Sequence, residues 1–151
     1  MTNKKLLTIN VFLIFFLIGI SKVIIGPSLP DIIANYGLSL TLAGSILGFL
    51  SFGRFISVLS ATHILDNHQY KPVLLIGTGL ITAGLTGNAL SFWWYGNLIT
   101  ILVIGFGIGL VGACNNVLIT ELKKKKRANY LNRSHMFYGI GALIGPFIAG
   151  V

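Results

Sequence analysis

"LITILVIGFGIGLVGACNNVL", residues 98–118, is a long apolar run that decides the class of fold. About 20 helical residues, at a rise of ~1.5 Å each, cross the ~30 Å hydrocarbon core of a bilayer. Gly107, Gly109 and Gly112 have the G-x-G-x-x-G spacing of a dinucleotide-binding loop. Such a loop follows a strand, opens a helix and precedes an acidic residue by about 20 positions. This run meets none of those conditions, so we predict a membrane-spanning helix whose glycines serve packing.

The composition of the whole chain agrees with a membrane protein. Of its 151 residues, 54% are hydrophobic and 9% are charged, whereas about a quarter of a soluble domain is charged. Similar apolar runs recur, and we expect an all-α membrane protein with five transmembrane helices over about 6–29, 42–65, 73–92, 98–118 and 131–151. The N-terminal run is longer than the apolar region of a signal peptide and lacks an A-x-A-like end. We therefore interpret it as a retained first span.

The basic residues near the ends of these spans predict the orientation. With the N-terminus in the cytoplasm, all of them lie inside: Lys4, Lys5, Lys71, Lys123, Lys124, Lys125, Lys126, Arg127 and Arg133. Trp93, Trp94 and Tyr95 then lie at the outer interface, where amphipathic rings are favoured. We predict a multi-pass protein of the cell membrane, such as a bacterial inner membrane. The basic run at 123–127 is interpreted as a cytoplasmic anchor and not as a nucleic-acid-binding segment.

Two cations lie within the apolar runs, where a charge costs about 2.5–3.5 kcal/mol on insertion scales. Arg54 is 13 residues past Thr41, which places it roughly 18–20 Å inside the helix. Its helical neighbours Ser51, Ser57 and Ala61 are small and suit a cavity or a helix interface. We expect Arg54 to face a substrate cavity, the alternative being a structural pairing with backbone carbonyls.

Lys22 lies nearer the outer boundary, where its long stem can reach the headgroups. Gly19 and Gly26, one turn before and after it, equally suit a packed face. If Lys22 and Arg54 face one cavity, an anionic substrate is a further hypothesis.

Small-residue pairs predict where helices approach each other closely. G-x-x-x-G occurs at Gly105 with Gly109, at Gly141 with Gly145, and at Gly44 with Gly48. The spans from 98 onward also carry Asn115, Asn116, His135 and Tyr138. Asn116 suits an interhelical contact, which is worth about 0.6 kcal/mol on average.

Few residues are suited to catalysis or metal binding. Cys114 is the single cysteine, so an intrachain disulfide is excluded, and the sequence shows no Cys/His spacing typical of a metal site. Three acids and three histidines scattered along the chain give no catalytic pair or triad. We expect neither an enzyme nor a cofactor.

The connector "THILDNHQYKP", 62–72, resembles the cytoplasmic loop motif G-x-L-a-D-R-x-G-R-K of the major facilitator superfamily. Asp66 falls on the acid of the motif and Lys71 on its final basic residue, so the resemblance implies a gating role for both. Four positions depart from the motif, at Thr62, Asn67, Gln69 and Tyr70.

"GFGIGLVGACNNVLITEL" (105–122) and "ANYLNRSHMFYGIGALIGPFIAG" (128–150) are similar to the fourth and fifth spans of fucose-permease-like sugar–proton symporters. Asn115 falls on that group's asparagine and His135 on a polar, substrate-facing position. Together with the intramembrane cations, the resemblance implies a substrate site made from Lys22, Arg54, Asn115, His135 and Tyr138. Gly26 and Val111 stand where the group has carboxylates, which does not support proton coupling of that type.

The superfamily has twelve spans in two six-helix halves, with the substrate between the halves. The resemblance therefore implies that the five expected helices form an incomplete N-terminal half. It implies a truncated or fragmentary transporter, which is inactive alone and whose missing partner is the C-terminal half. Uptake of a sugar or related metabolite is favoured. The runner-up is a drug or metabolite efflux antiporter, which "GALIGPFIAG" (141–150) also resembles. A small membrane protein acting as a partner subunit is a further alternative, and the bilayer and a small molecule are the expected partners.

Overall fold

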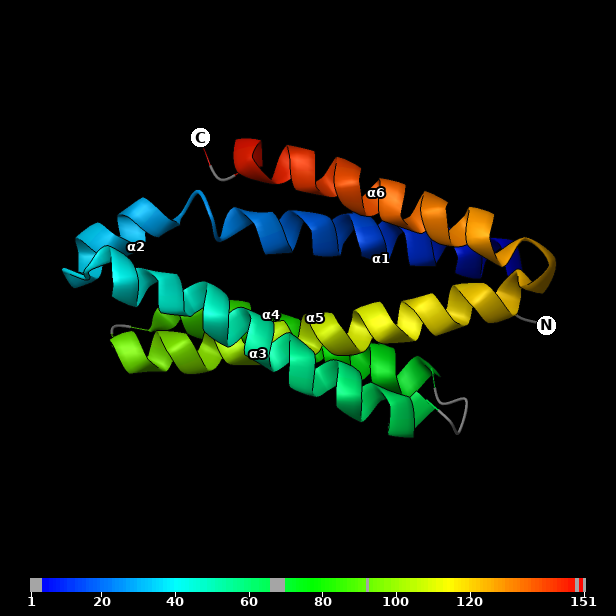
Figure 1. Ribbon diagram of the computed structural model, residues 1–151, viewed down its shortest axis with the longest axis horizontal. Coiled ribbons are helices and arrows are strands. Elements are labelled where there is room, and N and C mark those ends of the chain that lie inside the picture. Colours follow the sequence, from blue (N-terminus) through cyan, green and yellow to red (C-terminus); the bar gives the residue numbers. More distant parts are fainter. Residues whose placement is uncertain (1–3, 66–69, 92, 149, 151) are drawn as a thin grey trace. The chain divides into compact units, whose positions relative to one another are not determined.

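The computed structural model describes residues 4–65, 70–91, 93–148 and 150, and every regular element in these ranges is a helix (Figure 1). In chain order the helices are α1 (Lys4–Ile24), α2 (Leu29–Tyr36), α3 (Leu40–Leu65), α4 (Tyr70–Leu90), α5 (Trp94–Leu122), the short 3-10 helix η1 (Lys124–Lys126) and α6 (Arg127–Ile148). Within the described residues, α1, α3, α4 and α5 are long and apolar enough to cross a membrane. The chain is thus an all-α membrane protein with four candidate spans.

The expected fifth span, 131–151, overlaps α6, which is not among those four candidates. The first turns of α6 carry Arg127, Arg133 and several other polar residues, which lower its mean hydropathy. Five membrane crossings therefore stay a prediction.

The structure differs from the sequence expectation between the first two spans. Helix α1 ends at Ile24, short of the expected position 29. Pro27 has no backbone N–H to continue the helix, and the chain turns through 25–28, where the Gly26 N–H donates to the carbonyl of Val23 at 3.2 Å. The expected connector 30–40 then contains α2, whose first turn carries Asp31 at the favourable end of the helix dipole.

The chain divides into two compact units, of which the first comprises residues 1–31 and 115–151. In this unit α1 lies alongside α6 (Figure 1). A Cβ on Gly19 would meet the backbone carbonyl of Tyr138, and a Cβ on Gly141 would meet that of Phe16. The two backbones therefore touch, and only glycine fits at either position. The apolar cluster beside this contact contains Val11, Phe15 and Ile119, with Phe12, Leu118, Tyr130, Leu131 and Tyr138 packed against it.

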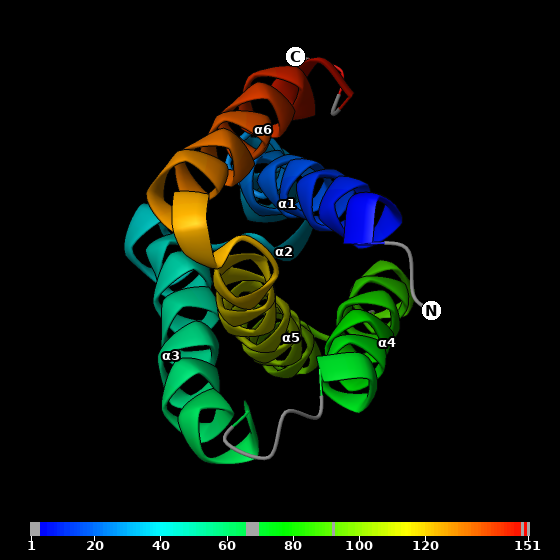
Figure 2. The ribbon, with the colours of Figure 1, turned by 90° about the vertical axis from the view of Figure 1, so that its right-hand side faces the viewer.

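The second unit comprises residues 32–114, and within it α5 lies between α3 and α4 (Figure 2). On the α3 side, a Cβ on Gly105 would meet the carbonyl of Leu50, and one on Gly109 would lie 2.8 Å from the carbonyl oxygen of Arg54. On the α4 side, a Cβ on Gly107 would lie 2.7 Å from the carbonyl oxygen of Gly77. The run of glycines in α5 thus faces two neighbouring helices at once.

The remaining glycines of the expected G-x-x-x-G pairs differ in how closely they approach a neighbouring helix. Gly145 makes a looser approach, because its Cβ would lie 3.2 Å from the carbonyl oxygen of Ile20. Gly44 and Gly48 have nothing within 4 Å of an added Cβ among the described residues. Close helix packing at this last pair therefore stays a prediction, because spacing alone does not say which face of α3 meets a neighbour.

A hydrogen-bonded network joins α2, α4 and α5 at one end of the second unit. The side-chain amide of Asn97 donates to the hydroxyl of Tyr36 at 2.6 Å, and that hydroxyl donates to the carbonyl of Ser91 at 2.7 Å. Asn88 donates to the amide oxygen of Asn97 at 2.8 Å and to the hydroxyl of Thr100 at 3.3 Å. The amide nitrogen and the amide oxygen of the buried Asn97 thus each have a hydrogen-bond partner.

We predict that Gly105→Leu lowers the free energy of unfolding by about 1–3 kcal/mol or more, because the carbonyl of Leu50 is backbone and cannot move aside. Gly112→Leu on the same helix is the matched control, since a Cβ there meets nothing within 4 Å. Thermal unfolding in mild detergent measures both. Equal melting temperatures for the two variants would contradict the packing role of Gly105.

Candidate functional site

Lys22 and Tyr138 are 116 positions apart in the chain, yet they meet between α1 and α6. The Nζ atom of Lys22 lies 5.9 Å from the centroid of the Tyr138 ring, within the range of a cation–π interaction, which is worth about 0.5–2 kcal/mol. Gly19 lies one turn before Lys22 and brings the α1 backbone against Tyr138 itself. The close helix contact therefore positions two of the predicted substrate residues together.

His135 lies one turn before Tyr138 on α6 and is exposed. Its ring meets the ring of Phe15 on α1 edge-on, with centroids 5.4 Å apart. Phe15 precedes Lys22 by seven residues, or roughly 10 Å along α1. His135 and the Lys22–Tyr138 pair thus lie at different positions along the same contact between α1 and α6.

Asn115 is completely buried in α5, at 0% exposure. Neither its amide nitrogen nor its amide oxygen has a hydrogen-bond partner among the described residues. Leaving buried polar atoms unpaired costs about 1–3 kcal/mol, so such a group needs water or a ligand. Ile119, one turn further along α5, belongs to the apolar cluster against which Tyr138 packs. Asn115 therefore lies one helical turn from that cluster.

Arg54 belongs to the second unit, and its side chain is exposed. Ser57 and Ala61 of the expected small stripe are buried, and a Cβ on Gly109 would lie 2.8 Å from the Ser57 side chain. Ser57 thus packs on α5, whereas Ser51 is exposed and the Arg54 guanidinium forms no ion pair in the described part of the chain. That Arg54 joins the other four residues in one substrate site stays a prediction.

Of the two predicted gating residues, the structure describes only Lys71. Asp66 lies outside the described residues, and Lys71 is exposed at the second position of α4. No group of three or more His, Cys, Asp or Glu side chains that could hold a metal ion occurs among the described residues.

Sequence reasoning missed a row of aromatic rings between α1 and α6. Phe12 stacks on Phe137 with centroids 5.1 Å apart, and on Tyr130 with centroids 6.3 Å apart. Phe12 and Phe15 are spaced by one helical turn, but inside a continuous apolar run that spacing does not stand out. The rings line the same contact that holds His135 and Tyr138.

The helices and their apolar lengths define the class of this protein as a multi-helix membrane protein. The chain belongs to the Major Facilitator Superfamily, whose sequence model matches residues 11–151. The family membership predicted from the sequence is confirmed.

Relatives of the chain include proteins named as sugar transporters. It is 28% identical over 141 residues to the Homo sapiens "Sodium-dependent glucose transporter 1", covering 89% of this chain and 26% of the relative. It is 30% identical over 142 residues to the Mus musculus "Sodium-dependent glucose transporter 1A", covering 89% and 32%. An Arabidopsis thaliana protein, "ZINC INDUCED FACILITATOR-LIKE 1", is 29% identical over 110 residues, covering 72% and 23%. The chain thus spans about a quarter to a third of these relatives, and no solved structure matches it.

We predict that Asn115→Leu leaves the melting temperature unchanged or raises it, because an apolar side chain of similar size replaces an unpaired buried amide. Asn97→Leu is the matched control, since Asn97 is also buried but hydrogen-bonded to Tyr36 and Asn88. We expect that control to lose about 1–3 kcal/mol of stability. Thermal unfolding in detergent compares the two, and an equal loss in both would show that Asn115 has a structural partner.

Proposed function

We propose that this chain is part of a transporter that carries a small polar solute, a sugar or related metabolite, into the cell. The observation that carries this proposal is the family match over residues 11–151, a region that contains every predicted site residue. Relatives named as glucose transporters support the solute class. The activity proposed is transport, not catalysis.

The side chains between α1 and α6 suit a hydroxyl-rich ligand. Lys22 offers three N–H donors, the Tyr138 hydroxyl can donate and accept, and His135 has one donor and one acceptor when neutral. The nearby ring of Phe15 supplies an apolar surface. Binding sites for small molecules commonly combine such an aromatic wall with a few polar groups. The unpaired amide of Asn115 is the fourth group that we assign to the solute.

We propose an alternating-access mechanism, in which two halves rock around a central site. The chain's share of its relatives' length supports a further part of the transporter that completes the cavity. We assign the five expected spans to the N-terminal half, and the gate to Asp66 and Lys71.

The lysines and arginines near the helix ends support a cytoplasmic N-terminus in the cell membrane. The three acids of the chain, Asp31, Asp66 and Glu121, all lie outside the interiors of the expected spans. Coupling to protons through an acid of this chain is therefore not part of the proposal.

We predict that Lys22→Ala lowers solute uptake by about 10- to 100-fold, because a hydrogen bond from a charged donor is worth about 1.5–3 kcal/mol. Arg54→Ala and Asn115→Leu are expected to lower uptake similarly. Lys5→Ala, another α1 lysine that lies at its exposed first turn, is the matched control. Uptake of radiolabelled glucose into proteoliposomes, with and without a sodium gradient, is the measurement.

Competition by unlabelled solutes in the same uptake assay distinguishes the classes of substrate. Inhibition by neutral sugars supports the proposal, whereas inhibition by organic anions alone would replace it with an anionic substrate. Unchanged uptake in Arg54→Ala would remove Arg54 from the site. Solute expelled from the vesicle interior in place of uptake would favour the efflux alternative.

A further inference from the structure

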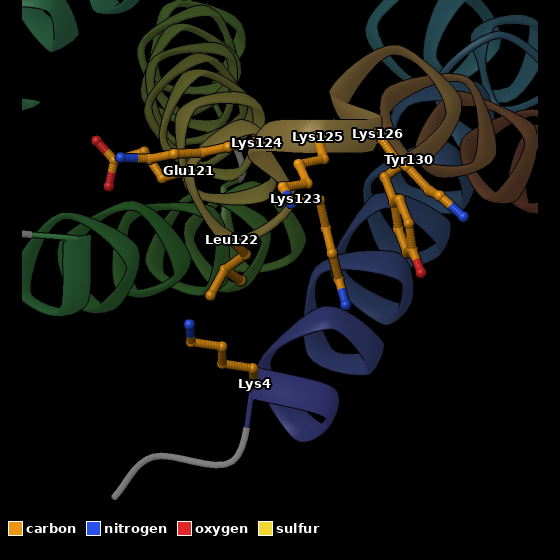
Figure 3. A pocket seen from close by; sticks show the side chains of 8 residues that line it. All are labelled: Lys4, Glu121, Leu122, Lys123, Lys124, Lys125, Lys126 and Tyr130. Carbon is orange, nitrogen blue, oxygen red and sulfur yellow. The ribbon is translucent and has the colours of Figure 1, made fainter.

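A cavity of about 540 Å³ lies where α5 ends and α6 begins, beside the start of α1 (Figure 3). Its lining residues come from both ends of the first unit: Lys4, Glu121, Leu122, Lys123, Lys124, Lys125, Lys126 and Tyr130. Five ammonium groups against one carboxylate give the cavity a strong positive excess. Such a concentration of like charge favours an anionic occupant.

The loop that carries the lysines is locally ordered. The backbone N–H of Lys123 donates to the carbonyl of Ile119 at 3.1 Å, and that of Lys126 donates to the carbonyl of Lys123 at 2.8 Å. The Nζ atom of Lys123 lies 4.7 Å from the centroid of the Tyr130 ring. Tyr130 in turn stacks on Phe12 of α1. The aromatic contact thus holds the half-buried Lys123 on the cavity wall.

Figure 3 shows that the side chains of Lys4, Lys123 and Tyr130 lie on one side of the loop, whereas Glu121 extends to the other side. Leu122 and the Tyr130 ring add apolar surface beside these two ammonium groups. An occupant that matches this wall has both a negative group and an apolar part. Free phosphate has only the first of these.

We propose that this cavity binds the phosphate headgroup of an anionic phospholipid, with Lys4 and Lys123 as its principal contacts. α1 begins and α5 ends at the cavity, and both are candidate membrane spans, so their ends lie at the headgroup level. Basic clusters at this depth attract anionic lipids, and pockets between helices bind their headgroups. The proposal depends on the helices lying in a membrane and not on the identity of the transported solute.

The test uses the protein purified in detergent and titrated with phosphatidylglycerol or phosphatidylcholine, with bound lipid counted by native mass spectrometry. We expect phosphatidylglycerol to bind at least about 10-fold more tightly, and the double variant Lys4→Gln/Lys123→Gln to lose that preference. Lys5→Gln/Arg127→Gln is the matched control. It removes the same charge from the same two segments, but neither residue lines the cavity. We expect it to keep the preference within about 2-fold.

Further measurements test whether the bound phosphate belongs to a lipid, and whether a variant loses binding because it misfolds. Inorganic phosphate should not displace the bound lipid at millimolar concentration, and displacement would overturn the assignment to a lipid. An equal loss in the two double variants would show general attraction to charge and would also overturn the proposal. The charge-preserving Lys4→Arg/Lys123→Arg should retain the preference, and loss there, with an unchanged melting temperature, would contradict headgroup binding. Solute uptake is measured separately, so failure of this proposal leaves the transport proposal intact.

Discussion

Direct contact between helix backbones is the constraint on which the rest of this structure depends. In a bilayer the lipid tails are as apolar as the helix surfaces, so burial of apolar side chains contributes little to helix association. Close packing and interhelical hydrogen bonds contribute more, and close packing needs positions with little or no side chain. Gly19 and Gly141 supply them between α1 and α6, and Gly105 and Gly107 supply them on two sides of α5. These glycines bring neighbouring helices close enough for their side chains to meet.

The candidate site follows from that approach. Tyr138 contributes its backbone carbonyl to the contact at Gly19 and its ring to the contact with Lys22. A wider separation of α1 and α6 would move this ring away from the Lys22 ammonium and the His135 ring away from Phe15. Helix packing and the geometry of the candidate site are therefore properties of one helix pair, and a substitution at Gly19 is expected to affect both.

Much of the fold could be predicted from the sequence, because a bilayer imposes a minimum length on every apolar helix. The runs around 98–118 and 42–65 correspond to α5 and α3 on that ground. Helix α2 could not be predicted in the same way, since eight residues are too few to show a helical pattern. Gly44 and Gly48 show a second limit. G-x-x-x-G spacing places two glycines on one face of a helix, but it does not say whether another helix lies there.

Candidate site residues could be chosen from the sequence where a polar group lies in apolar surroundings, as Lys22 does, but the residues that they contact could not. Two buried asparagines show why. Asn97 has a hydroxyl and an amide as partners and so belongs to the structure of the second unit, whereas Asn115 has no partner among the described residues. The two share a residue type, and only the fold shows which of them has hydrogen-bond partners. A buried amide that the protein does not satisfy lowers stability, and binding of a polar group to that amide would offset the loss. The unpaired amide is therefore the main structural support for the solute-binding role that we propose for Asn115.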